Sequence, residues 1–253
     1  MTAIRLRSEA DFGALLASVI EDVQQASFHW RLHLRLRGSI RRYVRELNES
    51  RAFWSLTIGA HRDAALFRLA RLYEPHAGSL SLARLLDTIA DNLKLFDEAP
   101  FRARLKGNPF VDSLAKDARR PPVARLARDI RLVRPNDRLV SSLVDLRNQV
   151  LAHRDPRVVV GRARNPLVAL SDHQFEVLLT RASRIVNRYS ILFVAGSHLM
   201  RIMGDDDYLK VLKALREHRL SRERDFREEL KRAGLSAGSR RTRGIWTPPS
   251  RGK

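Results

Sequence analysis

EADFGALLASVIEDVQQASFHWRL, residues 9–32, decides the fold class of this chain. Its apolar side chains recur three or four residues apart, which places them on one face of an α-helix: Phe12, Leu15, Leu16, Val19, Ile20 and Val23. Ser8 precedes the run and is a favoured N-cap, because a serine hydroxyl accepts a hydrogen bond from a free N–H of the first turn. The stretch therefore predicts a long amphipathic helix over roughly residues 9–35.

The same periodicity continues along most of the chain and predicts an all-α fold. Further helices are expected over residues 40–72, 79–96, 138–153 and 173–200. We expect a kink near Gly59, and N-caps at Asn136 or Asp137 and at Ser171 or Asp172. Prolines and glycines interrupt residues 97–135, which should hold only short helices such as VARLARDIRLV. RVVVGRARNPLVAL should form an extended loop or a small hairpin.

The character of the sequence changes at residue 205. A helix that is charged almost all round is predicted first, followed by a basic tail that we expect to be disordered. The predicted organisation is thus a helical domain over residues 1–204 and a charged helix with a basic tail over residues 205–253. Arg240, Arg241 and Arg243, with Trp246 available for base stacking, are candidate RNA contacts in the tail.

The composition restricts the classes of function. The chain has 253 residues, 44% of them hydrophobic, which is enough for a full core, and it contains no cysteine. There is therefore no disulfide, thiolate metal site or cysteine nucleophile. The start of the chain lacks the apolar core of a signal peptide, and YSILFVAGSHLM, residues 189–200, is too short to cross a bilayer. We interpret that stretch as a buried helix and expect a cytoplasmic protein without a membrane span.

The formal net charge is +20, and most of the basic residues are arginine. Guanidinium groups bind phosphate in bidentate geometry and stack on bases, so this excess favours a nucleic-acid partner. A genome rich in G and C would also favour arginine over lysine, but it would not explain the net charge.

Two patterns resemble metal sites. His29 and His33 lie one helical turn apart, but no acidic residue follows as in H-E-x-x-H. Asp205, Asp206 and Asp207 are consecutive, so on a helix they would point in three directions, and acids are expected at a helix N-terminus. We therefore predict no metal and no cofactor.

Arg147 and His153, in DLRNQVLAHRD, are the remaining candidates for chemistry. An imidazole exchanges protons near neutral pH and a guanidinium stabilises extra charge on a phosphate, so the pair suits metal-free RNA cleavage. The spacing alone is weak, because the chain's eight histidines should give roughly four such matches by chance; it has one other, Arg71 with His76. Six residues of helix separate the two side-chain directions by about 120°, so one helix alone does not bring them together. A two-fold pairing of such helices could place both residues in a shared cleft.

RNQVLAHRD resembles the R-x(4–6)-H signature of HEPN domains, all-α proteins that include metal-independent endoribonucleases. HRDAALFRLARLYEP followed by SLSLARLLDTI resembles the AbiU2-like branch, which is associated with abortive infection. The resemblance covers roughly residues 10–200 and implies a homodimeric helical bundle with long antiparallel helices that cleaves tRNA or mRNA, in phage defence or as a toxin.

The resemblance also implies roles for individual residues. His153 would act as general base or acid, Arg147 would hold the scissile phosphate, and Asn148 would orient His153 or the phosphate. Cleavage would leave a 2′,3′-cyclic phosphate and a 5′-hydroxyl. Arg154 is a further candidate RNA contact.

Two positions depart from the family pattern. Asp155 stands where some HEPN toxins carry a tyrosine that a nucleotidyltransferase modifies, so that control is expected to be absent. Glu74 replaces the aspartate expected after Arg71-Leu72-Tyr73, and we expect this change to touch no catalytic residue.

Two other functions remain open from the sequence. One is a catalytically inert helical module that binds nucleic acid through its basic surface and tail. The other is a structural partner, such as an antitoxin or scaffold, that buries the helix with Arg147 and His153 in a protein interface; conversely, a nuclease toxin would itself have an antitoxin as a partner. Substitution of His153 separates the first from a nuclease, because binding would survive and cleavage would not.

Overall fold

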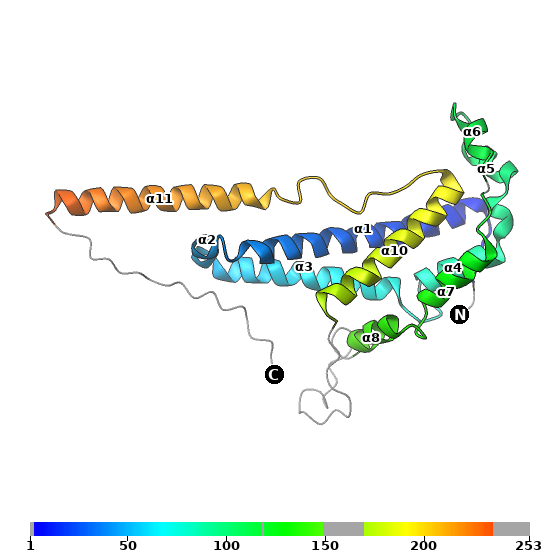
Figure 1. The fold of residues 1–253 in the computed structure, drawn as a ribbon, viewed down its shortest axis with the longest axis horizontal. Helices are drawn as coiled ribbons and strands as arrows, with labels where there is room; N and C mark the ends of the chain where they lie inside the picture. The colour runs from blue at the N-terminus through cyan, green and yellow to red at the C-terminus, as the bar shows by residue number, and fades with distance from the viewer. Residues whose placement is uncertain (1–2, 118, 149–169, 235–253) are drawn as a thin grey trace, which may run out of the picture. The chain divides into compact units, whose positions relative to one another are not determined.

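A computed structural model describes residues 3–117, 119–148 and 170–234. Figure 1 shows that these ranges are helical. They contain no strand, so the described part of the chain is all-α, as predicted. The elements are α1 (Glu9–Ser39), α2 (Val44–Glu49), α3 (Arg51–Leu72), α4 (Leu82–Asp91), the 3₁₀ turn η1 (Leu93–Phe96), α5 (Glu98–Arg104), α6 (Val111–Ala115), α7 (Val123–Leu132), α8 (Arg138–Leu146), α10 (Asp172–Val194) and α11 (Tyr208–Arg232). The predicted hairpin in RVVVGRARNPLVAL lies outside them, apart from Leu170.

The chain forms two compact units. Unit 1 comprises residues 1–27 and 65–200, and unit 2 comprises residues 28–64 and 201–253. Helices α1 and α3 each contribute residues to both units. Contacts group the C-terminal helix α11 with the second half of α1. The division predicted at residue 204, into a helical domain and a charged helix with a tail, stays a prediction.

Helices α1 and α3 are antiparallel. In unit 1, the Asp22 carboxylate of α1 accepts hydrogen bonds from Arg71 of α3 at 2.8 and 2.6 Å. In unit 2, His29 Nδ1 lies 2.8 Å from His61 Nδ1, and His33 Nδ1 lies 3.0 Å from the Ile58 carbonyl oxygen. As the residue number rises along α1, the number of the contacting residue in α3 falls. The two helices therefore run in opposite directions.

The start of α1 follows the predicted cap. The Ser8 hydroxyl accepts a hydrogen bond from the Asp11 N–H, and the Asp11 carboxylate accepts one from the Ser8 N–H. Hydrogen bonds from the backbone N–H of Arg7 and from Ser8 lower the pKa of Asp11. This reciprocal arrangement satisfies orphan N–H groups of the first turn.

The predicted second helix is divided differently from the expectation. The break lies at Ser50, between α2 and α3, whereas α3 is helical without interruption through Gly59. Glycine lowers helix propensity but does not end a helix whose neighbours pack well. The third predicted helix begins later than expected, with Ser81 as its N-cap, and tightens into a 3₁₀ turn after Asp91.

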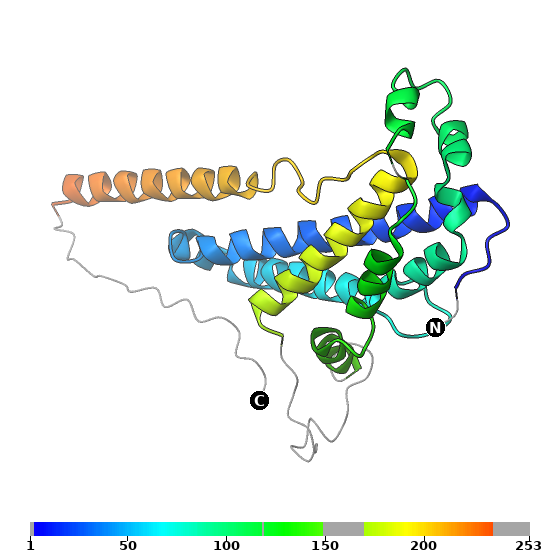
Figure 2. The ribbon, with the colours of Figure 1, turned by 45° about the vertical axis from the view of Figure 1, so that its right-hand side comes forward.

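The core of unit 1 contains three aromatic rings from separate elements. Phe12 of α1 packs edge-on against Phe96 of η1, with ring centroids 5.7 Å apart, and against Phe193 of α10 at 4.8 Å. All three rings are buried. Figure 2 shows α4 and α7 side by side in this unit, in agreement with their contacts. The rings thus fix the end of α10 against α1.

Helices α8 and α10 begin at the predicted caps. The Asp137 carboxylate accepts hydrogen bonds from the backbone N–H groups of Leu139 and Val140. Ser171 forms a capping box with Gln174. In both caps the side chain accepts hydrogen bonds from N–H groups of the first turn that have no partner within the helix. Short polar side chains at these positions therefore indicated where the helices begin.

Helix α10 is shorter than predicted. It ends at Val194, and Ala195 adopts a left-handed conformation with φ 54°. The stretch 189–200 is therefore not a continuous buried helix; Leu199, beyond the helix, is 80% exposed. Apolar residues continue in the sequence past the end of the helix, so the periodicity alone overestimated the length of the helix.

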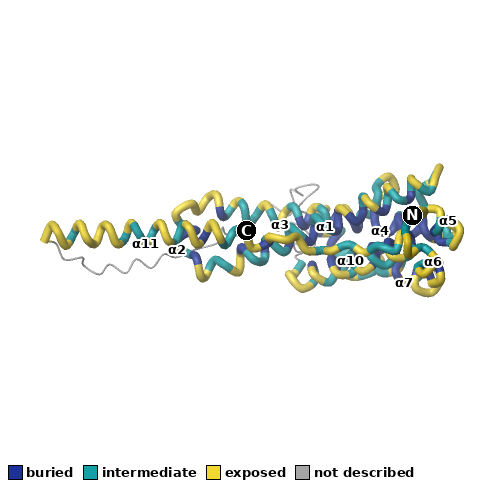
Figure 3. Tube along the Cα trace, turned by 90° about the horizontal axis from the view of Figure 1, so that it is seen from above, coloured by how far each residue is buried: buried dark blue, intermediate teal, exposed yellow. Residues whose placement is uncertain are grey.

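Unit 2 holds a smaller core in which the first turns of α11 pack. Leu212 of α11 is buried with Tyr43, Leu47 and Trp54. Glu46 of α2 is buried beside them and accepts hydrogen bonds from Arg216 and Arg219 of α11. Figure 3 shows that most of α11 beyond these turns is exposed, as expected for a helix charged almost all round.

None of the helices in the described ranges has the length and apolar character that a membrane crossing requires.

Candidate functional site

Arg147 and Asn148 lie directly after α8 and continue it as a wider π-helical turn. Arg147 donates hydrogen bonds from Nε and Nη2 to the Asn148 side-chain oxygen, at 3.1 and 2.8 Å. Its Nη1 forms an ion pair with the Glu74 carboxylate. The structure therefore brings together two predicted site residues and one that was not predicted.

Glu74 is positioned by the turn that follows α3. Its Oε1 accepts a hydrogen bond from the His76 backbone N–H at 3.0 Å, and its Oε2 pairs with Arg147. The side chain of Glu74 is 13% exposed. The expectation that the replacement at residue 74 touches no catalytic candidate is wrong: the carboxylate contacts the Arg147 guanidinium. Sequence reasoning missed this contact because 73 residues separate the two positions.

The contacts of Arg147 leave part of its guanidinium accessible. A guanidinium carries five N–H groups, and three of them are used by the contacts to Asn148 and Glu74. Among the contacts of the described residues, one N–H on each terminal nitrogen is not used, and guanidinium N–H groups of this kind pair with phosphate oxygens. The side chain is 26% exposed, so an anion from solvent can reach it.

The residues before Glu74 anchor the same turn to two other helices. Arg71 binds the buried carboxylate of Asp22 on α1, which also accepts a hydrogen bond from Arg68 at 3.0 Å. The buried Tyr73 hydroxyl donates to the Leu178 carbonyl oxygen of α10 at 2.8 Å. The Arg-Leu-Tyr-Glu sequence therefore joins α3 to α1, α10 and the end of α8.

The contacts of Arg71 distinguish the two Arg-x(4–6)-His matches in the sequence. Arg71 is held by Asp22, and His76 Nδ1 accepts a hydrogen bond from the Gly78 N–H at 3.1 Å. That match has a structural role. Arg147, in contrast, has two N–H groups that the described residues do not use.

The other predicted site residues lie outside the described residues: His153, Arg154, Arg240, Arg241, Arg243 and Trp246. Their roles stay predictions. In unit 1 the structure places a second cluster of cations that the sequence analysis did not single out.

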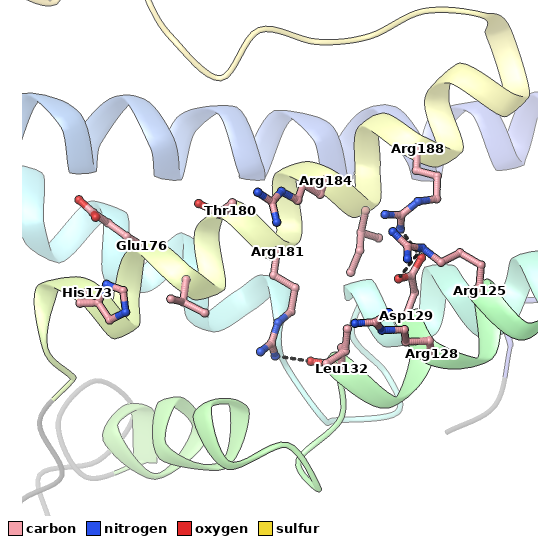
Figure 4. A pocket seen from close by; sticks show the side chains of 12 residues that line it. Arg125, Arg128, Asp129, Leu132, His173, Glu176, Thr180, Arg181, Arg184 and Arg188 are labelled. Atoms are coloured by element: carbon pink, nitrogen blue, oxygen red, sulfur yellow. Dashed lines mark hydrogen bonds and ion pairs between the residues drawn. The ribbon is translucent and has the colours of Figure 1, made fainter.

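A cavity of about 510 Å³ lies between α7 and α10. It is called the arginine groove below, after Arg125, Arg128, Arg181, Arg184 and Arg188 in its lining. Figure 4 shows Arg125 and Arg188 converging on Asp129, and Arg181 turned toward Leu132 at the end of α7. A signal was present in the sequence, since 181, 184 and 188 recur at helical spacing. The pairing of α7 with α10 was not predictable from that spacing.

The metal-like patterns have other contacts. His29 faces His61, and burial lowers the pKa of His61. Asp205 is buried and forms ion pairs with arginines of unit 2, including Arg31 at 2.9 Å and Arg35 at 3.2 Å. Across residues 3–117, 119–148 and 170–234, no group of three or more histidine or acidic side chains could hold a metal ion.

A family model described as AbiU2, of the HEPN domains, matches residues 9–215. The chain belongs to the AbiU2 family of HEPN domains. No curated protein and no solved structure matches it significantly. The match confirms the resemblance drawn from the sequence, and it places Glu74, Arg147, Asn148 and the arginine groove inside the AbiU2 region.

The AbiU2 match extends to residue 215, whereas the resemblance was expected to cover roughly residues 10–200. Residues 208–215, the first turns of α11, supply Tyr208, Leu209, Leu212 and Leu215 to the core of unit 2. Beyond residue 215 most of α11 is exposed. Contacts of α11 with unit 2 continue slightly beyond the matched residues, because Arg216 lies over the Tyr43 ring and both Arg216 and Arg219 bind Glu46.

Proposed function

We propose that this AbiU2 protein is a metal-independent endoribonuclease that cleaves RNA, such as tRNA or mRNA, in phage defence or as a toxin. Family membership supports an RNA substrate, because HEPN domains are commonly ribonucleases. The single observation that carries the proposal is the set of contacts that Arg147 makes. It lies within the family region and is oriented by Asn148 and Glu74, and two of its N–H groups have no partner among the described residues and could bind a phosphate.

The proposed reaction is an attack of the 2′-hydroxyl on the adjacent phosphorus. His153 accepts the 2′-hydroxyl proton as general base, the new P–O2′ bond forms, and the P–O5′ bond breaks. The leaving 5′-oxygen receives a proton from an imidazolium acting as general acid. Arg147 stabilises the extra negative charge on the phosphoryl oxygens. The products are a 2′,3′-cyclic phosphate and a 5′-hydroxyl, and no metal takes part.

The proposed catalytic unit is a homodimer. Within one continuous helix Arg147 and His153 would point about 120° apart. A two-fold pairing of protomers places two copies of each residue in one cleft, which supplies one imidazole as base and one as acid.

The first test compares RNA cleavage by the wild-type protein with cleavage by Arg147→Ala and His153→Ala. We expect both variants to lose at least a hundredfold in kcat, in line with the effect of removing a general acid–base or a charge-stabilising group. His218→Ala is the matched control, because it removes an exposed histidine of α11 that has no contact with the candidate site among the described residues. We expect it to keep wild-type activity.

The alternative of an inert RNA-binding module makes the opposite prediction. In that case wild type and both variants would bind RNA equally well and cleave none of it. Equal cleavage by wild type and His153→Ala would also reject the proposed chemistry.

A further inference from the structure

We propose that the arginine groove is a binding site for the sugar-phosphate backbone of single-stranded RNA, separate from the Arg147 site. This inference rests on the proposed function for its substrate class. The groove itself is defined by its own contacts. Its cavity lies between two helices of unit 1, and eight of its twelve lining residues are ionisable.

The cations of the groove fall into two groups. Arg188 binds the buried Asp129 carboxylate, which also accepts a hydrogen bond from the Tyr189 hydroxyl at 3.0 Å. Arg125 lies 3.9 Å from the same carboxylate. These contacts join α7 to α10, so Arg188 and Asp129 hold the two walls together.

Arg181 has a similar structural role. It donates to the Leu132 carbonyl oxygen at the end of α7 and lies 3.1 Å from the Asp137 carboxylate that caps α8. It therefore connects the floor of the groove with the helix that leads to Arg147. Asp137 and Arg147 flank α8 and are ten residues apart, so at a rise of 1.5 Å per residue about 15 Å of helix separates them.

Arg128 and Arg184 form the second group. Each is exposed, and neither has an ion-pair partner among the described residues. They belong to facing helices, which the contacts of Asp129 and Arg181 hold in place. Two cations on opposite walls, each without an ion-pair partner among the residues that the structure describes, favour an anionic ligand that enters between them.

The chemistry of the lining favours a phosphodiester chain over a compact apolar ligand. Small-molecule sites are lined mostly by apolar side chains, whereas here five arginines face two acids, Asp129 and Glu176. Guanidinium groups bind phosphate oxygens in bidentate geometry without reading bases. The groove should therefore increase affinity for RNA without sequence preference.

The test measures RNA affinity of an Arg128→Gln/Arg184→Gln double variant by titration at several salt concentrations. The probe is a single-stranded RNA with every 2′-hydroxyl methylated, which cannot undergo the proposed cleavage. The logarithm of the association constant falls linearly with the logarithm of the salt concentration. Loss of two phosphate contacts should make this slope less steep by about 1.4 and weaken binding roughly tenfold at low salt. An Arg5→Gln/Arg131→Gln double variant is the matched control, since both residues are exposed, lie outside the groove and remove the same charge. It should keep the wild-type slope.

Two outcomes would overturn the proposal. One is an unchanged slope in the groove variant, and the other is an equal loss in the control, which would indicate only a general charge effect. Neither result depends on catalysis. If wild type cleaves RNA but the groove variant binds RNA normally, the groove proposal is wrong and the nuclease proposal is retained. If wild type cleaves no RNA but the groove variant loses affinity, the groove proposal is retained and the nuclease proposal is wrong.

Discussion

At the scale of single residues, the ion pair between Glu74 and Arg147 decides how the proposed site works. The carboxylate is fixed by the His76 N–H and the guanidinium by Asn148. We therefore expect Glu74 to act as a positioning residue of the proposed site. Glu74→Ala should lower kcat about tenfold, equivalent to about 1.4 kcal/mol of transition-state stabilisation, with KM within twofold of wild type. Steady-state kinetics on an RNA substrate measure both constants.

Glu74→Gln provides the matching control for this role. The amide oxygen still accepts a hydrogen bond from Arg147, so the variant should recover part of the lost kcat. A faster reaction in both variants would contradict the positioning role and indicate that Glu74 competes with the phosphate for Arg147.

At the scale of elements, Glu46 couples the attachment of α11 on α2 to pH. Burial alone would raise the pKa of Glu46, but hydrogen bonds from its own backbone and from Arg216 and Arg219 outweigh burial and lower the pKa. The folded state therefore favours the ionised carboxylate. This contribution to stability is fully present above pH 4.5, the ordinary value, and is lost as pH falls through the lowered pKa.

Hydrogen exchange along α11 between pH 7 and pH 3 tests this coupling. Protection of the first turns of α11 should fall in acid, and Trp54 fluorescence should change with it because Trp54 shares a core with Leu212. Glu46→Gln should weaken the attachment by about 2 kcal/mol at pH 7, since it removes charged hydrogen bonds. It should also remove part of the pH dependence; an identical pH profile in this variant would contradict the assignment to Glu46.

At the scale of the whole molecule, the sequence predicted the kind of element better than its length and partners. Ser8, Asp137 and Ser171 marked helix starts correctly, because a cap is a local hydrogen bond. The end of α10 at Val194 was missed, since apolar residues continued beyond it.

The candidate site was predictable only in part, for the same physical reason. Arg147 and Asn148 stood in a local motif, whereas the contact of Arg147 with Glu74 arises from packing between distant segments. The arginine groove likewise needs α7 and α10 side by side. Spacing along one helix indicates a face, but not what lies opposite it.

The proposed function depends on one chemical step, in which the chain cleaves RNA through the 2′-hydroxyl without a metal. The most direct measurement incubates the wild-type protein in EDTA with a single-stranded RNA and with the DNA strand of the same sequence, and identifies the product ends by mass spectrometry. We expect RNA fragments with 2′,3′-cyclic phosphate and 5′-hydroxyl ends, and intact DNA. Intact RNA, cleaved DNA, or fragments with 3′-hydroxyl and 5′-phosphate ends would contradict the proposed function.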